Sequence, residues 1–179
     1  MPSESPNQES NEVSSNAPTT SATRPEVHWL VKLFASGFYS GFSPVASGTI
    51  GSAVALAIYF IPGFEQPWVI LPTIAITFFL GVRTARAMEA RYGHDPGEIT
   101  IDEMAGMWIA LLFLPKSLFI AALAFFIFRI FDIIKPYPAR KFDNVHGGMG
   151  IMMDDVVAGI YTNLLLHALH VVFSPNQLF

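Results

Sequence analysis

Apolar runs separated by short polar or small-residue segments fill the chain from residue 27 onward. The runs cover residues 50–61, 68–82, 104–114, 118–131 and 156–173, and proline-containing turns at 62–67 and 115–117 separate two pairs of them. Uninterrupted apolar segments of this length predict helices buried in protein or in lipid. Each is shorter than the ~20 residues that cross a bilayer comfortably, so flanking residues would have to extend it. The pattern therefore predicts an all-α membrane helical bundle with about four to five membrane-embedded helices.

A shorter amphipathic stretch precedes these runs. In residues 27–38, Trp29, Leu33 and Phe34 recur around Lys32 with helical spacing. This pattern predicts a helix lying in the membrane interface, with Trp29 at the depth of the headgroups. Residues 1–26 are rich in Ser, Pro, Asn, Thr and Glu and are expected to form a flexible acidic tail. The membrane-embedded domain would then span 27–173, and 174–179 would form a short C-terminal tail.

The composition supports an integral membrane protein. Hydrophobic residues make up 52% of the chain and charged residues 13%, against about 25% charged residues in a soluble domain. Mean hydropathy is +0.45. The absence of cysteine excludes disulfides, thiolate metal sites and cysteine-nucleophile phosphatases. The net charge of −4 is concentrated in the tail, which argues against nucleic-acid binding. The sequence makes no prediction about oligomeric state.

The distribution of Lys and Arg predicts a topology. If both proline turns lie on one side of the membrane, the tail and the polar segments 83–103 and 132–155 share the other side. Nine of the ten Lys and Arg residues then fall on that second side, and only Lys116 opposes them. Such a bias predicts that the amino terminus and the acidic clusters described below face the cytoplasm. A single proline-kinked helix over 104–131 would instead put those clusters on opposite sides.

Two acidic pairs stand at the ends of apolar runs. Asp102 and Glu103 precede one run, and Asp154 and Asp155 precede the last. Carboxylates at membrane depth are costly and usually face a cavity, a partner or an ion. Hard oxygen ligands suit Mg²⁺, the usual cation of phosphate chemistry. The competing interpretations are a capping box between Thr100 and Glu103, and ordinary helix-start acids at the second pair.

A basic segment lies between the two acidic pairs. Arg129, Asp132 and Lys135 are three residues apart and share one helix face. Arg129 lies inside an apolar run, where it needs a partner, and a guanidinium can clamp a phosphate through two hydrogen bonds. Prolines at 136 and 138 are expected to end this helix and leave Arg140 and Lys141 on a loop. Arg140 is a candidate for substrate binding, although interfacial snorkelling explains both loop cations as well.

Small and polar residues complete the candidate substrate-binding set. Glycines before a helix let backbone amides approach an anion, and hydroxyls can hydrogen-bond a headgroup. Turn geometry at a helix start also accounts for each of these residues taken singly. The set consists of Ser43, Ser47, Thr49, His146, Gly147 and Gly148.

Four segments together carry a resemblance to a known family. Residues 41–52, 102–108, 128–138 and 145–159 in combination resemble the phosphatidylglycerophosphatase A family, and the likeness runs in order over roughly residues 28–170. The resemblance implies a Mg²⁺-dependent lipid phosphatase of phospholipid biosynthesis in the bacterial inner membrane. It would hydrolyse phosphatidylglycerophosphate to phosphatidylglycerol and phosphate. The acidic amino-terminal tail departs from the family, whose amino terminus is usually shorter.

These observations lead to one hypothesis and two rivals. We expect Asp102, Glu103, Asp154 and Asp155, with Asp132 as a further candidate, to hold Mg²⁺ at the cytoplasmic interface. Arg129 and Lys135 would bind the phosphate oxygens, and either water or a carboxylate would be the nucleophile. The first rival is a metal-dependent lipid phosphotransferase, which needs a second headgroup substrate. The second is a small transporter module, whose charges would line an ion path.

Overall fold

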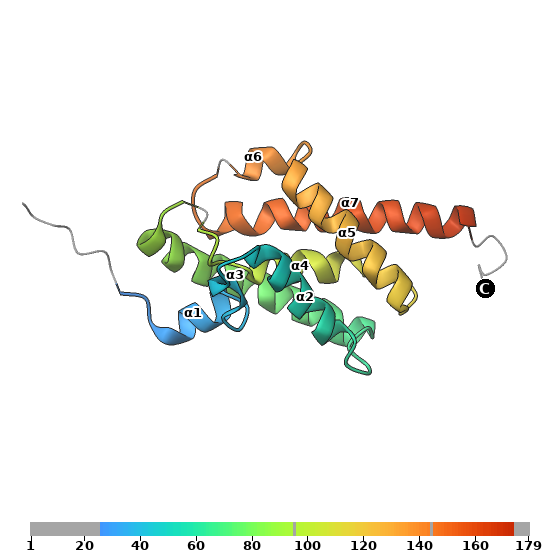
Figure 1. The fold of residues 1–179 in the computed structure, drawn as a ribbon, viewed down its shortest axis with the longest axis horizontal. Coiled ribbons are helices and arrows are strands. Elements are labelled where there is room, and N and C mark those ends of the chain that lie inside the picture. Colours follow the sequence, from blue (N-terminus) through green and yellow to red (C-terminus); the bar gives the residue numbers. More distant parts are fainter. Residues whose placement is uncertain (1–25, 95, 144, 174–179) are drawn as a thin grey trace, which may run out of the picture.

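The computed structural model describes residues 26–94, 96–143 and 145–173, and all regular structure within these ranges is helical. Of the expected tails at 1–26 and 174–179, residues 1–25 and 174–179 lie outside the described residues. The all-α class is therefore confirmed for the described part of the chain (Figure 1). The elements in order are α1 (Trp29–Ala35), the 3-10 helix η1 (Ser40–Phe42), α2 (Ser47–Tyr59), α3 (Pro67–Tyr92), α4 (Ile101–Ala110), α5 (Leu118–Ile134), α6 (Ala139–Asp143) and α7 (Gly148–Phe173).

Two of these helices are long and apolar enough to cross a membrane. These are α3 and α7, which have 26 residues each. Their 18-residue apolar stretches have mean hydropathies of 1.6 and 1.7. The helices α2, α4 and α5 are shorter, at 13, 10 and 17 residues. The expectation of about four to five embedded helices therefore stays a prediction. Both long helices extend beyond their apolar runs: α3 continues through the polar segment 83–92, and α7 begins at Gly148.

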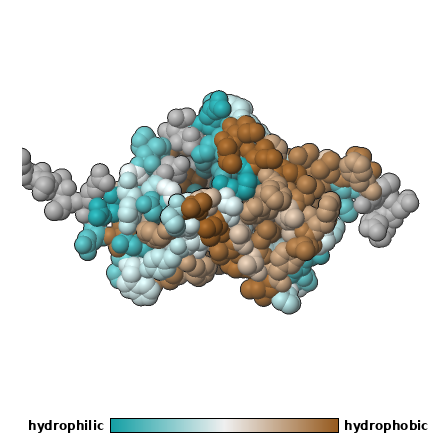
Figure 2. Space-filling model, viewed as in Figure 1, coloured by the Kyte–Doolittle hydropathy of each residue, from teal (hydrophilic) through white to brown (hydrophobic). Residues whose placement is uncertain are grey.

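Large apolar side chains cover much of the outer surface. Ile76 and Phe79 on α3, Phe119 and Phe126 on α5, and Leu164 on α7 are all more than half exposed. Figure 2 shows hydrophobic residues over most of the half of the molecule that holds the carboxyl end of α7, while hydrophilic residues gather toward the opposite end. Continuous apolar surface of this kind marks an interaction site, and here it favours contact with lipid.

The short helix α4 lies at the centre of the bundle. It packs against α2, α3, α5 and α7, and eight of its ten residues are buried. Trp108 anchors it to α2, since its indole Nε1 donates a 2.9 Å hydrogen bond to the carbonyl of Ala55. Small residues make this close approach possible, as the sequence indicates, because Ser52 and Ala55 of α2 are fully buried.

The two proline-containing turns meet at the far end of the bundle. Lys116 Nζ lies 2.6 Å from Glu65 Oε2 and 2.9 Å from the Ile61 carbonyl oxygen, and it stands over the ring of Tyr59 at 5.4 Å. The hydrogen bond from Lys116 lowers the pKa of Glu65. The turns 62–67 and 115–117 therefore lie at the same end of the molecule.

The chain reverses between α4 and α5. Glu103 at the start of α4 approaches Arg129 near the end of α5, with 3.9 Å between the carboxylate and guanidinium. The alternative of one kinked helix over 104–131 is therefore wrong. The helix α5 ends at Ile134 as expected, and Lys135 caps it with a left-handed φ of 47°. The segment after it, expected to be a loop at 140–143, forms the single-turn helix α6 instead.

Candidate active site

A close crossing of α4 and α7 creates the site. A Cβ atom built on Gly159 would meet the carbonyl oxygen of Gly106, and one built on Gly106 would lie 2.7 Å from the carbonyl oxygen of Asp155. The backbones of α4 and α7 are therefore in contact at Gly106 and Gly159, and neither glycine has room for a side chain. Asp102 and Asp155 each stand one helical turn before these glycines. Residues one turn apart share a helix face, so the crossing brings the two carboxylates together.

Three carboxylates meet beside this crossing. One oxygen from each of Asp102, Glu103 and Asp155 lies within 4.8 Å of the others. Asp102 and Asp155 are 8% and 2% exposed. The expectation that acidic side chains from distant segments converge therefore matches the geometry of the described residues.

Helix capping does not explain these acids. Thr100 precedes α4 as its N-cap residue, but its side chain makes no capping hydrogen bond. Its hydroxyl instead lies 2.9 Å from Ser40 Oγ, so the expected capping box with Glu103 does not form. Asp154 and Asp155 stand in the second turn of α7, whose first turn contains no acidic residue.

Arg129 enters the acidic cluster from α5. Its Nη1 lies 2.7 Å from Asp132 Oδ2, although the N–H is not aligned for a hydrogen bond. Within the described residues, Arg129 Nε, Arg129 Nη1 and Glu103 Oε2 are buried polar atoms without a hydrogen-bond partner. Buried polar atoms are nearly always paired, so these atoms indicate capacity for a further ligand.

Gly48 at the start of α2 closes the cluster from the other side. A Cβ atom at this position would collide with Glu103 Oε1 and lie 2.9 Å from Arg129 Nη1. The charged pair therefore packs directly against the α2 backbone. Gly48 and Gly159 were not among the candidate site residues. The signal that was available is the spacing of small residues at 48, 51 and 52, which marks a close helix contact.

Asp154 faces a different partner from the other three acids. Its Oδ2 lies 2.8 Å from Lys135 Nζ, and its Oδ1 accepts a 3.0 Å hydrogen bond from the Asp155 amide. Asp154 was expected to join Asp102, Glu103 and Asp155 as a metal ligand, but the three-carboxylate group does not include it. The ion pair with Lys135 accounts for the difference.

These side chains line one small cavity of about 220 Å³. Six of the seven expected catalytic residues form its walls, and the seventh, Arg129, reaches the cluster through its contacts with Glu103 and Asp132. Ser47 is the expected substrate-binding residue that also lines it. The complete lining is Ser47, Pro96, Gly97, Ile99, Asp102, Glu103, Asp132, Ile133, Lys135, Asp154 and Asp155.

The other two hydroxyl residues lie apart from this cavity. Ser43 lines a neighbouring depression with Ser47 and Glu98, and its hydroxyl donates a 3.0 Å hydrogen bond to the Val45 carbonyl. Thr49 stands in the first turn of α2, outside the residues that line the acidic cavity. For these two residues the local turn interpretation fits the geometry better than contact with a headgroup.

The glycine-rich segment also lies elsewhere. His146, Gly147 and Gly148 line a separate cavity of about 760 Å³ on the α3 side. Gly147 has a φ of +97°, and a Cβ atom at Gly148 would collide with the backbone of Val82. Chain geometry therefore accounts for both glycines.

Glu89 organises that separate cavity, a role that its sequence context did not signal. Its Oε2 accepts a 2.7 Å hydrogen bond from the Gly147 amide, and its Oε1 lies 2.8 Å from His94 Nδ1. The rings of His94 and His146 stack with 4.3 Å between their centroids. Glu89 therefore holds the segment before α7 against α3.

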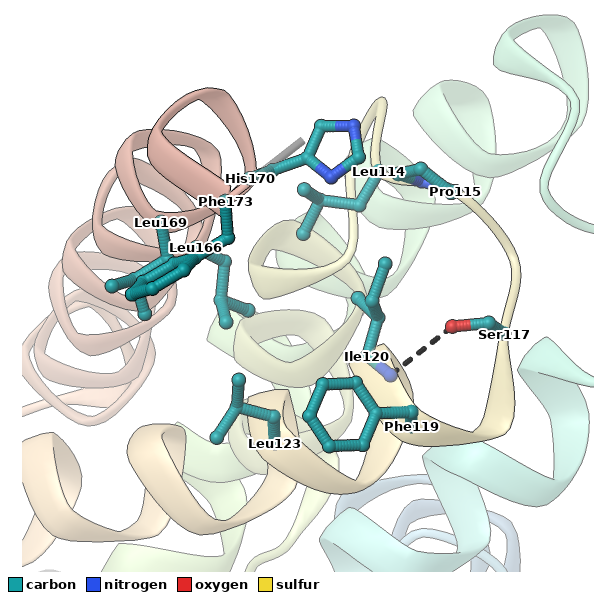
Figure 3. A pocket seen from close by; sticks show the side chains of 10 residues that line it. All are labelled: Leu114, Pro115, Ser117, Phe119, Ile120, Leu123, Leu166, Leu169, His170 and Phe173. Atoms are coloured by element: carbon teal, nitrogen blue, oxygen red, sulfur yellow. Dashed lines mark hydrogen bonds between the residues drawn. The ribbon is translucent and has the colours of Figure 1, made fainter. Parts of the chain in front are cut away.

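A large apolar cavity of about 600 Å³ opens at the other end of the molecule (Figure 3). Apolar residues of α5 and α7, phenylalanines included, form most of its walls, and Ser117 accepts a hydrogen bond from the Ile120 amide at its edge. His170 is the only titratable residue among its described lining residues. This cavity contains no arrangement for phosphate chemistry.

Comparisons with known proteins agree with this geometry. The model of the family described as Phosphatidylglycerophosphatase A matches residues 33–170. A protein of Escherichia coli strain K12 named Phosphatidylglycerophosphatase A is 46% identical over 143 residues, covering 75% of this chain and 80% of the relative. Its Haemophilus influenzae namesake is 37% identical over 143 residues, covering 78% and 88%.

A Bacteroides thetaiotaomicron protein named "Putative phosphatidylinositol-3-phosphatase" is 41% identical over 146 residues, covering 77% of this chain and 92% of the relative. No solved structure matches the chain. The family match spans most of the chain and includes every residue of the acidic cavity. The chain therefore belongs to the phosphatidylglycerophosphatase A family, and it is a phosphatase.

Proposed function

We propose that this protein is a Mg²⁺-dependent lipid phosphatase that hydrolyses phosphatidylglycerophosphate to phosphatidylglycerol and inorganic phosphate in phospholipid biosynthesis. The observation that carries the proposal is the meeting of three carboxylates within 4.8 Å, beside an arginine whose buried Nε and Nη1 have no hydrogen-bond partner among the described residues. Carboxylates suit a divalent cation, and the arginine suits phosphate oxygens. Membership of the phosphatidylglycerophosphatase A family supports the choice of substrate.

The residues of the cavity fit a hard cation. Asp102, Glu103 and Asp155 offer only oxygen atoms, and Glu103 Oε2 is buried without a partner among the described residues. We assign the Mg²⁺ to these three side chains. When bound, the ion neutralises charge on the phosphomonoester and polarises its P–O bond.

The remaining side chains position the phosphate. Arg129 Nε and Nη1 have no hydrogen-bond partner among the described residues, and Asp132 Oδ2 lies 2.7 Å from Nη1 as an ion-pair partner. Lys135 brings a second cation to the cavity, and Asp154 fixes its ammonium at 2.8 Å. Phosphoryl transfer depends mainly on such positioning and charge stabilisation. Asp132 and Asp154 therefore act through the cations that they orient.

The metal requirement is directly testable. We expect purified protein in uncharged detergent micelles to release phosphate from phosphatidylglycerophosphate, to lose this activity with EDTA, and to regain it with excess Mg²⁺. The name of the Bacteroides relative makes phosphatidylinositol 3-phosphate the second candidate substrate, to be compared in the same assay. Full activity in EDTA would remove the metal from the proposal, and a requirement for a second headgroup alcohol would identify a phosphotransferase.

We further propose that the protein crosses the bacterial inner membrane several times, with the acidic cavity at the cytoplasmic face. Support comes from the contact between Lys116 and Glu65, which joins the two proline turns, and from the excess of Lys and Arg at the opposite end. The lipid tails would then stay in the bilayer while the headgroup reaches the cavity.

Single cysteines provide a test of this topology, because the natural chain contains none. The exposed positions Pro62 and Val145 lie in the far turn and before α7. We expect a membrane-impermeant thiol reagent to label Pro62→Cys in cells whose outer membrane is permeabilised. Val145→Cys should react only after the inner membrane is opened. Labelling of both positions from the same side would contradict the proposed topology.

A further inference from the structure

We infer that a basic cavity next to the acidic one binds the phosphodiester group of the lipid headgroup. This inference rests on the proposed function. The basic cavity encloses about 490 Å³ and is lined by Ile134, Lys135, Pro136, Tyr137, Arg140 and Lys141. Three of these six residues are cations. Lys135 lines both cavities, so the two sites are joined through one side chain.

The basic cavity is held in place relative to the acidic one. Lys135 leaves the end of α5 in a left-handed conformation, and its ammonium reaches Asp154 on α7. The Tyr137 carbonyl accepts a 2.7 Å hydrogen bond from the hydroxyl of Tyr161, also on α7. Ala139 at the start of α6 is 1% exposed. The cationic wall is therefore attached to α7, the helix that carries Asp155, one of the three proposed metal ligands.

The two cations from α6 stand at the open side of this cavity. Arg140 and Lys141 are exposed, and Lys141 Nζ stacks over the ring of Tyr137 at 5.0 Å. A cation over an aromatic face is held by the ring quadrupole and keeps its N–H donors available to an anion. The neighbouring Ile133, Ile134 and Tyr137 are exposed by 73%, 58% and 71%, which provides apolar surface for the adjoining part of a lipid.

The chemistry of the substrate matches this pair of cavities. A phosphatidylglycerophosphate headgroup carries a terminal phosphomonoester and, across one glycerol unit, a phosphodiester. The monoester, with up to two negative charges, suits the cavity with proposed metal ligands. The diester carries one negative charge, and the three cations of the basic cavity, Lys135, Arg140 and Lys141, attract it. The arrangement therefore favours lipids that carry both groups over lipids with a phosphomonoester alone.

The test uses the double substitution Arg140→Gln and Lys141→Gln in the full-length protein, assayed in uncharged micelles so that general attraction to an anionic membrane does not contribute. We expect about a 10-fold loss of kcat/KM for phosphatidylglycerophosphate, mostly through KM, because two charged hydrogen-bond donors are removed. Phosphatidylglycerol, which carries only the diester, should inhibit the natural protein competitively and the double variant far more weakly. Arg83→Gln with Arg86→Gln, on the exposed face of α3, is the matched control and should change neither value.

An unchanged KM and unchanged inhibition in the double variant would overturn the inference, and so would an equal loss in the control pair. The first result would mean that Arg140 and Lys141 only place positive charge at the membrane interface and do not bind the substrate. Failure of the natural protein to release phosphate from phosphatidylglycerophosphate would instead count against the proposed function. The two failures are therefore distinguishable in one set of assays.

Discussion

Replacing Asp155 with Asn will reduce phosphate release by at least about 10²–10³-fold, the range found when one stabilising group is removed from an active site. The substitution keeps the shape of the side chain but removes its charge from a group of three carboxylates within 4.8 Å. Asp102→Asn is expected to have the same effect. Steady-state phosphate release, with Mg²⁺ varied over a wide range, measures both the loss in rate and any shift in the Mg²⁺ requirement.

Glu65→Gln supplies the matched control for these substitutions. It also removes one carboxylate, but at the far turn, where Glu65 pairs with Lys116. This ion pair is partly exposed and lies outside the residues that line the acidic cavity, so activity should stay within about twofold of the natural protein. Near-normal turnover of both aspartate variants, with normal membrane insertion, would remove these residues from the metal site.

Gly159→Leu is expected to abolish activity without touching a charged group. Even a Cβ atom at this position meets the Gly106 carbonyl oxygen, so a leucine must push α7 away from α4. Asp102 and Asp155 stand one turn before the two glycines, and the separation would open the carboxylate group. Metal ligands tolerate displacements of only ~0.2 Å. Phosphate release and the Mg²⁺ concentration for half-maximal activity measure the effect.

Ala75→Leu on the exposed face of α3 is the control for added bulk. Both variants should reach the membrane in similar amounts, and the control should keep full activity. If Gly159→Leu retains the Mg²⁺ requirement and turnover of the natural protein, the close crossing does not set the geometry of the site.

The helices were predictable where the hydrophobic pattern alone determines them. The end of α5 at Ile134 follows from the prolines at 136 and 138. The start of α7 was not predictable, because glycines usually indicate a turn. Here Gly148 and Gly150 are helical and pack against the backbones of Val82 and Val145. Tertiary packing overrides the local preference of glycine at these positions.

The candidate site was predictable in its residue types but not in its pairings. Buried carboxylates at membrane depth need partners, which is why Asp102, Glu103 and Asp155 could be singled out. Nothing in the sequence distinguishes the roles of Asp154 and Asp155. In the structure, Asp154 forms an ion pair with Lys135, whereas Asp155 joins Asp102 and Glu103 in the three-carboxylate group. The location of His146 was also not predictable from the sequence. Its place beside glycines indicated an anion site, whereas it stacks on His94 in a separate cavity.

The contact between Gly106 and Gly159 has a consequence for how this protein can diversify. Main-chain atoms define the spacing of the two helices, so the side chains that face outward on α3, α5 and α7 take no part in setting it. With the bundle in a bilayer as proposed, those outward positions can change from one apolar residue to another and so adapt to bilayers of different thickness and fluidity. The residues that set the geometry of the site are thereby distinct from those on the outer surface, so the outer surface can vary while the site stays unchanged.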